Sequence, residues 1–431
     1  MNKRHGQRTH FRNYPLHFRP RTVPGQTLRL SLSWGLGGIA VVLVCLLFGT
    51  GLMLKFFYEP SPERAYESII YLRDSVPFGL LIRNIHRWSA NGLVLVVFLH
   101  FLRIYYTGAF VGSRRVNWFV GLALFATVVL ANFTGYLLPW DQTAYWAITI
   151  STSMLDYLPG LGTGIRHWLL GGAEPGSRTL LNFYAIHTAV LPALMLLALP
   201  FHFWRIRKAK GLVLPAPVEG ENDPREEVVE TMPHLIIREV AMAMMVVAVI
   251  LLSAMFFDAP LAEQANPGLS PNPTKAPWYF MGVQETLMHF HPVFALQVIP
   301  LLLLTGLFCI PYIRYEADAS GVWFGSGKGL KLALIAVIVA TLATVAGVLL
   351  DEWVISSDMT GPPNLVNNGL LPFSTIAVAC GGFYLLMKKA FKANNNEAIQ
   401  ALFTLLTTAF VVLTIIGIWF RGSGMKLMWV G

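Results

Sequence analysis

The stretch PFGLLIRNIHRWSANGLVLVVFLHFLRIY, residues 77–105, is long and apolar enough to cross a bilayer, yet it carries two histidines. A helix spans the hydrocarbon core with about 20 mostly apolar residues, so the stretch predicts a transmembrane helix. His86 and His100 are fourteen residues apart. That interval completes about four helical turns, which places both side chains on one face, roughly 21 Å apart along the axis. Ionisable side chains at such depth are costly and usually functional.

A second histidine pair lies on another predicted span, near residues 178–204, where His187 and His202 are fifteen residues apart. Because one further span lies between the two histidine-bearing spans, both cross the membrane in the same direction. His86 therefore shares a level with His187, and His100 shares one with His202. Paired imidazoles without a nearby thiolate or carboxylate are typical of an electron-transferring haem iron. The pattern predicts two haem b groups, with each iron bound by two histidines.

Glycines on the neighbouring spans repeat the same interval, and glycine lets a flat macrocycle approach a helix backbone closely. On one span Gly37 and Gly51 are fourteen residues apart, and on another Gly121 and Gly135 are fourteen apart. Guanidinium groups pair well with the anionic propionates of a haem. Three arginines are candidates for that role: Arg83, Arg87 and Arg103. Taken singly, a histidine, glycine or arginine in a membrane helix is also explained by packing, hydrogen bonding or snorkelling.

The composition of the whole chain indicates a membrane protein and excludes an ordinary soluble domain. Of the 431 residues, 55% are hydrophobic and only 13% are charged, and the mean hydropathy is +0.56. The apolar runs are continuous rather than alternating, which excludes a membrane β-barrel. We predict an all-α integral membrane fold with nine spans. They lie near residues 34–56, 77–105, 117–136, 178–204, 237–257, 293–314, 331–350, 370–388 and 398–420.

The net charge of +9 comes from short basic blocks between the spans, a pattern of membrane topology and not of nucleic-acid binding. Residues 1–29 carry seven Lys or Arg and no acid, so they are expected to form a cytoplasmic tail without a cleavable signal. The basic blocks at 114–115, 205–210, 328–331 and 388–392 then fall on the same side. We predict a multi-pass protein of the bacterial cytoplasmic (inner) membrane with a cytoplasmic N-terminus.

Near residues 211–235, prolines and acidic residues replace the apolar pattern. This change separates the first four predicted spans from the remaining five. The predicted parts are a basic cytoplasmic tail (1–33), a di-haem four-helix bundle (34–210), a linker (211–235), a three-helix part with a long outer loop (236–350) and two additional transmembrane helices (351–431). The segments expected on the outer side are 57–76, 137–177, 258–292 and 351–369. Loops of such length are usually functional.

Three short segments around the histidines carry a resemblance to a known family. They read LIRNIHRWSA at 81–90, TGYLLPWDQ at 134–142 and FYAIHT at 183–188. They resemble cytochrome b, the di-haem subunit of quinol:cytochrome c or plastocyanin oxidoreductases of the bc1/b6f type, in its cytochrome b6 branch. The resemblance is close over about 30–210 and moderate over 235–350, where it implies a fused subunit IV-like part. It is weak beyond that range.

The resemblance implies a role in electron transport within a respiratory chain. The histidine pair that contains His86 would ligate an outer-side haem, and the pair that contains His100 a cytoplasmic-side haem. A quinol oxidation pocket would be formed on the outer side by Tyr136, Pro139, Trp140, Pro277, Trp278 and Tyr279. A quinone would be reduced on the cytoplasmic side near Arg207 and Lys208, and the cycle would contribute to the proton-motive force.

The resemblance also implies a set of partners. They are a Rieske-type iron–sulfur protein that takes one quinol electron, a c-type cytochrome subunit, quinone and lipid. The complex would be homodimeric and would bind no nucleic acid. Its activity would be that of a quinol:cytochrome c oxidoreductase, or of one with another acceptor.

Two departures from the family pattern affect the expected chemistry. The family's Pro-Glu-Trp-Tyr motif reads Ala-Pro-Trp-Tyr at 276–279, so the carboxylate proposed to accept a quinol proton is missing. Glu285, His289 or His291 would supply the base if one of them reaches the pocket. Gly35 stands where the b6 branch has a cysteine that tethers an extra haem. A third, covalently held haem is therefore not expected.

Two other functions stay open at this point. A di-haem membrane anchor would pass electrons between quinone and a peripheral redox subunit without bifurcation, and it would not need the Pro-Trp and Pro-Trp-Tyr segments of the outer loops. A transporter would use its buried histidines to relay protons, and the purified protein would then contain no haem.

Overall fold

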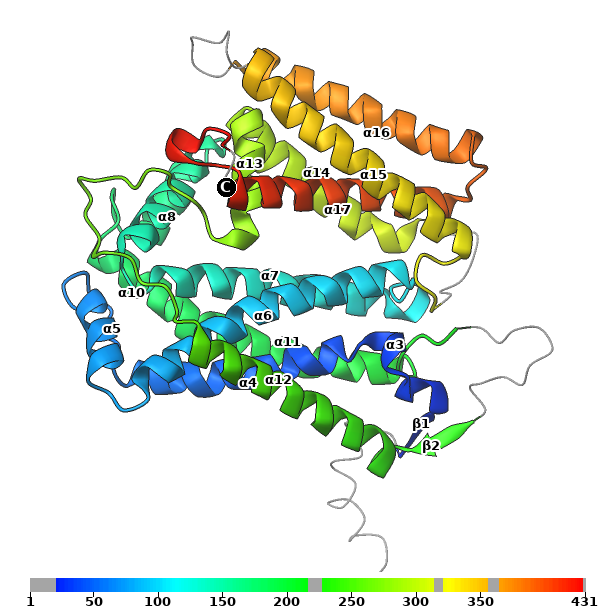
Figure 1. Cartoon of the computed structure of the whole chain (residues 1–431), viewed down its shortest axis with the longest axis horizontal. Coiled ribbons are helices and arrows are strands. Elements are labelled where there is room, and N and C mark those ends of the chain that lie inside the picture. The colour runs from blue at the N-terminus through cyan, green and yellow to red at the C-terminus, as the bar shows by residue number, and fades with distance from the viewer. Residues whose placement is uncertain (1–20, 216–226, 314–320, 356–363, 429–431) are drawn as a thin grey trace, which may run out of the picture.

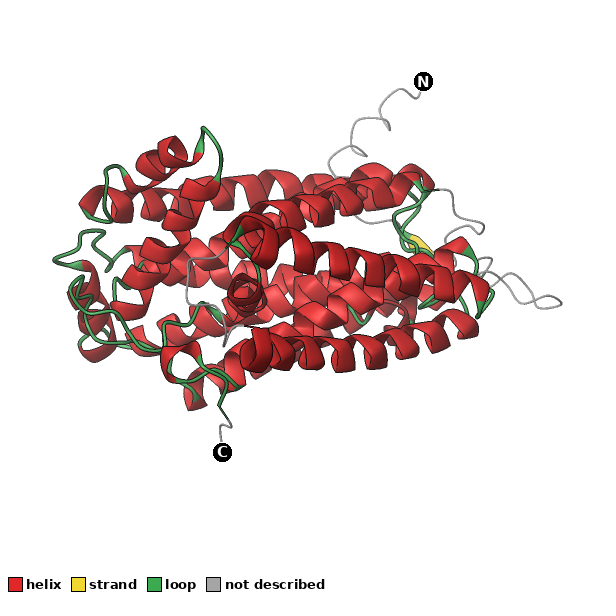
Figure 2. Ribbon diagram, turned by 90° about the horizontal axis from the view of Figure 1, so that it is seen from above, coloured by secondary structure: helices red, strands yellow, loops and turns green. Residues whose placement is uncertain are grey.

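The computed structural model describes residues 21–215, 227–313, 321–355 and 364–428. Within these residues, nine helices are long and apolar enough to cross a membrane, at the places where the sequence predicts them. Figure 2 shows that most of the described chain is helical. The prediction of an all-α, multi-pass membrane protein is confirmed. The predictions for residues 1–20 of the tail and 216–226 of the linker lie outside the described residues.

The spans are α4 (Leu36–Lys55), α6 (Gly79–Tyr106), α7 (Arg115–Leu137), the continuous helix α10–η4–α11 (Ser177–Ala185, Ile186–Val190, Leu191–Lys208), α12 (Ile236–Phe256), η7–α14 (Phe294–Val298, Ile299–Cys309), α15 (Gly327–Leu350), α16 (Leu371–Lys389) and α17 (Asn395–Trp419). The shorter helices are α3 (Leu30–Ser33), α5 (Ala65–Asp74), α8 (Gln142–Ser153), α9 (Gly162–Leu170) and α13 (Met281–His289). Single turns are η1 (Gly25–Leu28), η2 (Gly112–Arg114), η3 (Met154–Tyr157), η5 (Thr231–Leu235), η6 (Trp278–Phe280), η8 (Ile310–Tyr312), η9 (Asp351–Ile355), η11 (Leu365–Leu370) and η12 (Ser423–Met425).

The first four spans form a bundle, with α12 packed on its outside. Helix α6 packs against α4 and α7, α7 packs against α11, and α12 lies across α4 and α6. Figure 1 shows these helices running side by side. Apolar side chains from all five helices fill the centre of the bundle: Leu43, Leu93, Val94, Val128, Met195 and Ile250. This packed core fixes the separation of the two histidine-bearing helices.

The last three spans form a second group, drawn from yellow to red in Figure 1. Helix α17 packs against α15 and α16. The buried residues Ala336, Ala398 and Ala401 lie in this contact, and small side chains let membrane helices approach closely. Helix α17 also reaches the first bundle, because the Tyr106 hydroxyl hydrogen-bonds to that of Thr404 at 2.9 Å. The division of the chain into five parts stays a prediction.

A short two-stranded ribbon lies at the end of the molecule that the sequence places toward the cytoplasm. Strand β1 (Thr22–Pro24) pairs antiparallel with β2 (Val228–Glu230). Beside the ribbon, Arg238 donates to the Leu28 carbonyl at 2.6 Å. Strands of three residues leave no readable alternation in a sequence, so the sequence predicts only a tail and a linker here. The structure shows that these two segments, distant in the sequence, pair with each other.

At the opposite end, two side chains of α6 hold the chain where it leaves α12. The buried Asn84 donates to the Ala254 carbonyl at 2.9 Å and accepts from the Ala259 N–H at 2.8 Å. Arg83 donates to the carbonyls of Ala259 and Pro260, both at 2.7 Å. Backbone groups that emerge from a membrane helix need such partners. The long outer segment after α12 is therefore anchored to the first turns of α6.

Candidate haem centres and quinol site

The outer histidine pair brings together two imidazole rings from different helices. His86 on α6 and His187 on η4 have ring centroids 6.3 Å apart, with 71° between the ring planes. A metal–imidazole bond is about 2.0 Å long, so two rings bound to opposite sides of one metal have centroids roughly 6 Å apart. The observed separation fits one iron atom bound between the rings.

Hydrogen bonds to Nδ1 fix the protonation of both rings. The Thr50 hydroxyl donates to a carbonyl one turn earlier at 2.6 Å, so it accepts from Nδ1 of His86 at 2.9 Å. Nδ1 of His187 donates to the Ala131 carbonyl at 3.0 Å and lies 3.1 Å from the Thr134 hydroxyl. With Nδ1 protonated, Nε2 keeps its lone pair for a metal. The sequence analysis missed both threonines, although each directly precedes a glycine of the fourteen-residue pattern.

The glycines of the outer level lie directly against the histidine rings. A Cβ atom at Gly135 would lie only 2.5 Å from Cε1 of His187, and one at Gly51 would lie 3.2 Å from Cε1 of His86. Contacts below 3.0 Å are too short for carbon atoms, so Gly135 in particular has no room for a side chain. The sequence analysis expected these glycines to make room for a macrocycle. In the structure they lie against the imidazoles, and their role beside a macrocycle stays a prediction.

The inner level is formed by His100 on α6 and His202 on α11, which lie close enough to interact electrostatically. Both Nδ1 atoms are buried, and neither has a hydrogen-bond partner within the described ranges. Buried polar atoms without partners are rare and point to a bound water or another group. A Cβ at Gly37 would lie 3.8 Å from Cε1 of His100, and one at Gly121 would lie 3.6 Å from Cε1 of His202. The two levels therefore share one construction, with more space at the inner one.

A single π-turn explains why the second histidine pair is fifteen residues apart. In η4, which contains His187, the Leu191 N–H bonds to the carbonyl of Ile186, five residues earlier. A π-turn takes up one more residue than an α-helical turn. His202 therefore returns to the face that a fourteen-residue step reaches on α6. Such bulges are frequent at functional sites.

Two of the three predicted arginines carry unpartnered donors in the protein interior. Arg103 is 2% exposed, and its Nε and one terminal nitrogen find no hydrogen-bond partner in the described part of the chain. Nε of Arg87 is likewise buried and unpartnered there. Such donors fit an anionic group, as haem propionates are. Arg83 differs, because both its terminal nitrogens already hold the segment after α12. The propionate role of all three stays a prediction.

Tyr136 and Tyr279, two of the predicted quinol-site residues, come together around Arg87. The Arg87 guanidinium lies over the Tyr136 ring, 5.4 Å from its centroid. Burial raises the pKa of the Tyr279 hydroxyl, and the nearby charge of Arg87 opposes this effect. The same hydroxyl is buried and has no partner among the described residues. A neutral phenol in this state can form a hydrogen bond with a ligand oxygen.

The turn that carries Tyr279 is fixed against the first bundle. It begins at the buried Pro277. Trp278 Nε1 donates to the side-chain oxygen of Asn91 on α6 at 3.1 Å. The ring of Phe280 meets that of Phe133 on α7 edge-on, with 5.5 Å between centroids. The loop between α12 and α14 therefore packs against the middle of α6 and the C-terminal part of α7.

The other predicted segment of the pocket packs elsewhere. Trp140 is buried against Tyr145, with 5.7 Å between ring centroids, and the half-buried Pro139 precedes it. The next residue, Asp141, accepts from a backbone N–H in the first turn of α8 at 2.8 Å and from the Ala262 N–H at 2.9 Å. Asp141 joins the two outer loops. The sequence analysis missed it, although an Asp just before a helix is a recognised N-cap signal.

Glu285, the first candidate for a proton-accepting base, lies in a buried ion network. Its carboxylate accepts from Nη2 and Nε of Arg421 at 2.6 and 3.0 Å. His289 lies 3.2 Å from Glu285 through Nε2 and 2.6 Å from Asp351 through Nδ1. Arg421 also donates to Glu352 at 2.8 Å. We call these five residues the Glu285 network. No local signal could have revealed Arg421, because it lies 136 positions from Glu285.

Contacts within the network shift the pKa values of Glu285 and His289. Burial acts to raise the pKa of Glu285, but hydrogen bonds from His289 and Arg421 outweigh it and hold the pKa below its ordinary value. Burial acts to lower the pKa of His289, but Asp351 and Glu285 raise it to about 9. His291 accepts a backbone N–H two residues further on at 3.3 Å. An ionised carboxylate held by two cations is a poor proton acceptor, so the base role of Glu285 stays a prediction that this arrangement disfavours.

On the side expected to face the cytoplasm, the predicted quinone-reducing cations lie in the last turn of α11. Arg207 and Lys208 are both exposed. Lys208 Nζ lies 5.2 Å from the centroid of the Trp204 ring. Arg205 donates to the Ser113 carbonyl at 3.1 Å, which ties α11 to the loop before α7. The quinone role of the two cations stays a prediction.

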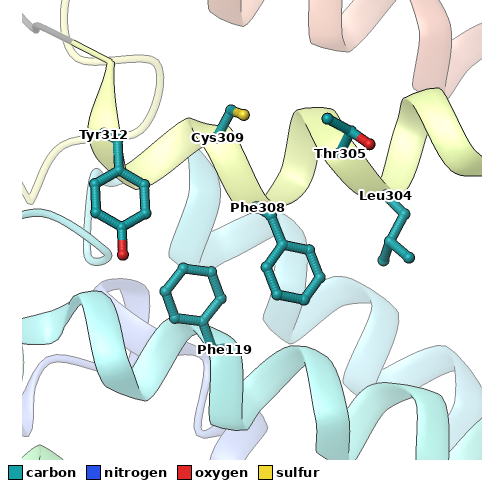
Figure 3. Close-up of a pocket in the computed structure, with 6 residues that line it drawn as sticks. All are labelled: Phe119, Leu304, Thr305, Phe308, Cys309 and Tyr312. Atoms are coloured by element: carbon teal, nitrogen blue, oxygen red, sulfur yellow. The ribbon is translucent and has the colours of Figure 1, made fainter.

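A separate cavity of about 500 Å³ lies between α7 and α14 (Figure 3). It is lined by Phe119, Leu304, Thr305, Phe308, Cys309 and Tyr312. The rings of Phe119 and Phe308 stack 5.1 Å apart, and nearby Trp118 donates to the Leu307 carbonyl at 2.9 Å. The cavity is mostly apolar, and it contains none of the predicted site residues. Its lining belongs to the contact that holds α14 on α7.

Known proteins share both the sequence of the bundle and the fold. Residues 23–210, which contain all four histidines of the two levels, match the family model of cytochrome b/b6/petB. The cytochrome b6 of Acaryochloris marina is 41% identical over 179 residues, which are 42% of this chain and 83% of that relative. The cytochrome b6 of Gloeobacter violaceus has the same identity and coverage. The chain belongs to the cytochrome b/b6 family.

The resemblance predicted from the motifs is thus confirmed, and membership in a family of b-type cytochromes implies haem b binding. The residues of this cytochrome b fit such a group at the outer level, where the ring spacing suits a metal and the Nδ1 atoms are bound by protein, so Nε2 of each ring remains for iron. A chain of a structure titled hyperthermophilic respiratory complex III has a TM-score of 0.64. The match covers 89% of this chain and 91% of that one at 23% identity, which shows a shared fold.

Replacing Gly135 with alanine is expected to remove the outer haem. The added Cβ would lie 2.5 Å from Cε1 of His187 and would displace this imidazole from its position opposite His86. Gly49→Ala is the matched control, because a Cβ at this position of α4 would meet nothing within 4 Å. Pyridine haemochrome spectra of the purified proteins measure haem per protein, which should fall by about half in the first variant. A full haem complement in Gly135→Ala would contradict the assignment.

The Glu285 network should make the protein less stable at alkaline pH. Because the pKa of His289 is raised from 6.5 to about 9, its contribution is complete below pH 6.5 and is lost as the pH rises through 9. The groups facing it are Glu285, Asp351 and Arg421, and Glu352 is bound to Arg421. We expect the free energy of unfolding to fall by up to about 3 kcal/mol. The readout is the thermal midpoint of unfolding in detergent, which should fall over the same pH range. His289→Gln should abolish this slope, and an unchanged slope would count against the network.

Proposed function

We propose that the chain is the di-haem cytochrome b subunit of a quinol-oxidising bc-type complex. The outer histidine pair carries the proposal. Its rings are 6.3 Å apart, and the Nδ1 atoms of His86 and His187 are bound by protein, so two Nε2 lone pairs remain for one iron. A second histidine pair, His100 on α6 and His202 on α11, lies about four turns further along these helices. Membership in the cytochrome b/b6 family supports the same function.

When bound, each haem supplies a centre that accepts and releases one electron. The chain sets the conditions for that chemistry. Thr50 and Thr134 orient the outer imidazoles through Nδ1. Arg87 and Arg103 offer buried cationic donors to the propionates. The apolar core between the helices excludes water and keeps the redox groups away from solvent.

The outer pocket around Tyr279 would bind the quinol head group. The Tyr279 hydroxyl is buried, neutral and unpartnered among the described residues, so it is available to a quinol oxygen. Arg87, which lies over the Tyr136 ring, would stabilise the anion that forms when the quinol loses a proton. Oxidation of one quinol releases two protons and two electrons. One electron would go to a Rieske-type iron–sulfur protein, and the other would enter this chain.

The proposal places the remaining steps on the cytoplasmic side and in partner subunits. Arg207 and Lys208, exposed at the end of α11, would favour the negative charge of a quinone that is being reduced. A c-type cytochrome subunit would receive electrons from the iron–sulfur protein. The complex would be homodimeric. Charge movement from the outer to the cytoplasmic side would contribute to the proton-motive force.

The proposal also covers location and domain organisation. The chain would lie in the bacterial cytoplasmic membrane with its N-terminus in the cytoplasm, because the basic blocks then fall on one side. The part up to residue 210 would act as the cytochrome b6-like bundle. Residues 236–350 would act as a fused subunit IV-like part that contributes the quinol loop.

One observation favours a second function, a di-haem anchor that passes electrons between quinone and a peripheral redox subunit. Position 277 is a proline, and the Glu285 carboxylate is bound to Arg421, so neither offers a free carboxylate to a quinol proton. An anchor does not bifurcate electrons and does not need that base.

Histidine replacements test the proposed function. In the purified complex, His86→Ala or His187→Ala should each remove the outer haem, and His100→Ala or His202→Ala the inner one. Joint replacement at one level should remove no more haem than a single change, because both residues serve one iron. Haem per protein and low-temperature absorbance spectra give the count. Loss of both haems from a single change would contradict the pairing.

A second measurement separates bifurcation from an anchor. The wild-type complex is mixed with a naphthoquinol, with and without a one-electron oxidant for the iron–sulfur protein. Bifurcation couples the two electrons of one quinol, so the oxidant should increase the absorbance of reduced b haem. In an anchor the oxidant should only drain electrons and decrease it.

A further inference from the structure

The segment after the ninth described span ends next to the loop that carries the proposed quinol pocket. Figure 1 shows the end of α17 beside α13. The Glu285 network joins three separate parts of the chain there. Glu285 and His289 lie on α13, Asp351 and Glu352 follow α15 in η9, and Arg421 follows α17. The side chains of Glu285 and Arg421 are both fully buried, so the contact between these parts excludes solvent.

Helices α13 and α17 touch almost backbone to backbone. A Cβ at Gly282 would lie 2.6 Å from the hydroxyl oxygen of Thr414, and one at Gly417 would lie 2.9 Å from Cε of Met281. Small residues on both sides of a helix contact allow this closeness. The same interface therefore has two glycines along its length and an ion pair at its end.

The segment just before the pocket is bound to the same end of α17. Lys275 Nζ donates to the Ile418 carbonyl at 2.9 Å. The N–H of Gly424 donates to the side-chain oxygen of Asn272 at 2.5 Å. Both bonds cross from the loop between α12 and α13 to residues at or after the end of α17. The loop is thus held at several points by one element.

Gln284 links the orientation of α13 to the pocket wall. It neighbours Glu285, and its side-chain oxygen accepts from the Ala276 N–H at 2.7 Å while its nitrogen donates to the Thr274 carbonyl at 2.8 Å. Ala276 directly precedes the 277–279 turn. A rotation of α13 would therefore move the backbone that enters the turn, and with it Tyr279.

The charge pair gives α13 one well-defined position. A guanidinium fork that bonds a carboxylate through two nitrogens fixes direction as well as distance. Arg421 does this with Glu285 through Nε and Nη2. Separating the two buried partners would leave both charges uncompensated, so the pair opposes any displacement of α13 that would part Glu285 from Arg421.

We propose that Arg421 is a positioning residue of the quinol oxidation site, which holds Glu285 and thereby fixes α13 and the 277–279 wall of the pocket. The inference rests on the proposed function. It gives the last described span a role of its own, as the element that clamps the outer pocket.

The test uses the purified, haem-containing complex and two variants of the pair. Arg421→Lys keeps the charge but loses the fork. The double variant Arg421→Met/Glu285→Met removes both buried charges together, which proteins often tolerate. Arg64→Met is the matched control, because Arg64 lies in an outer loop with its side chain 60% exposed. Deuterium exchange of residues 272–289, haem content, and kcat and KM with a naphthoquinol are measured.

We expect faster exchange over 272–289 in both variants of the pair and a KM for quinol that rises roughly tenfold. Haem content and kcat should change little, and the control should match the wild type. Wild-type exchange in both variants, or faster exchange with an unchanged KM, would overturn the proposal. So would a joint loss of haem and kcat at constant KM. If the wild-type complex holds haem but oxidises no quinol, the proposed function fails, and the exchange data still decide whether Arg421 holds the loop.

Discussion

An imidazole inside a membrane needs a partner for each ring nitrogen, and at the outer level the described residues supply a partner for Nδ1 alone. Nδ1 of His86 is bound by Thr50, and Nδ1 of His187 by a backbone carbonyl. Nε2 of each ring is left available for a metal. The rest of the bundle serves this arrangement. Gly51 and Gly135 leave the rings their space, and the π-turn brings the second histidine of its helix into line.

The proposed outer pocket is built from parts that are distant in the sequence. Tyr136 and Arg87 come from the first bundle, Tyr279 comes from the loop after α12, and Arg421 comes from beyond α17. Apolar packing places the helices, but short polar contacts at their outer ends place the loops. The geometry of such a pocket therefore depends on how the two helix groups meet. Helix α17 belongs to both, through its contacts with α15 and with Tyr106 of α6.

Features that repeat along one helix could be predicted from the sequence, because helical periodicity converts an interval into a face. This applies to the spans, the histidine intervals and the matching glycines. Contacts between distant segments could not be predicted. Arg83 bonds to carbonyls more than 170 positions away, and Glu285 to an arginine 136 positions away. Each of these side chains has a plausible local role in the sequence, a propionate partner for Arg83 and a proton acceptor for Glu285, and that role gives no sign of the distant contact.

The position of Arg421 also has a consequence for the order of assembly. The residue follows all the described spans, so the contact with Glu285 cannot form until the translocon has released α17 into the bilayer. The first bundle, with both histidine levels, is synthesised well before that moment. Cofactor insertion can therefore precede maturation of the outer pocket. A newly made chain at that stage would have the histidine-bearing bundle but not yet the contact that fixes the proposed quinol pocket.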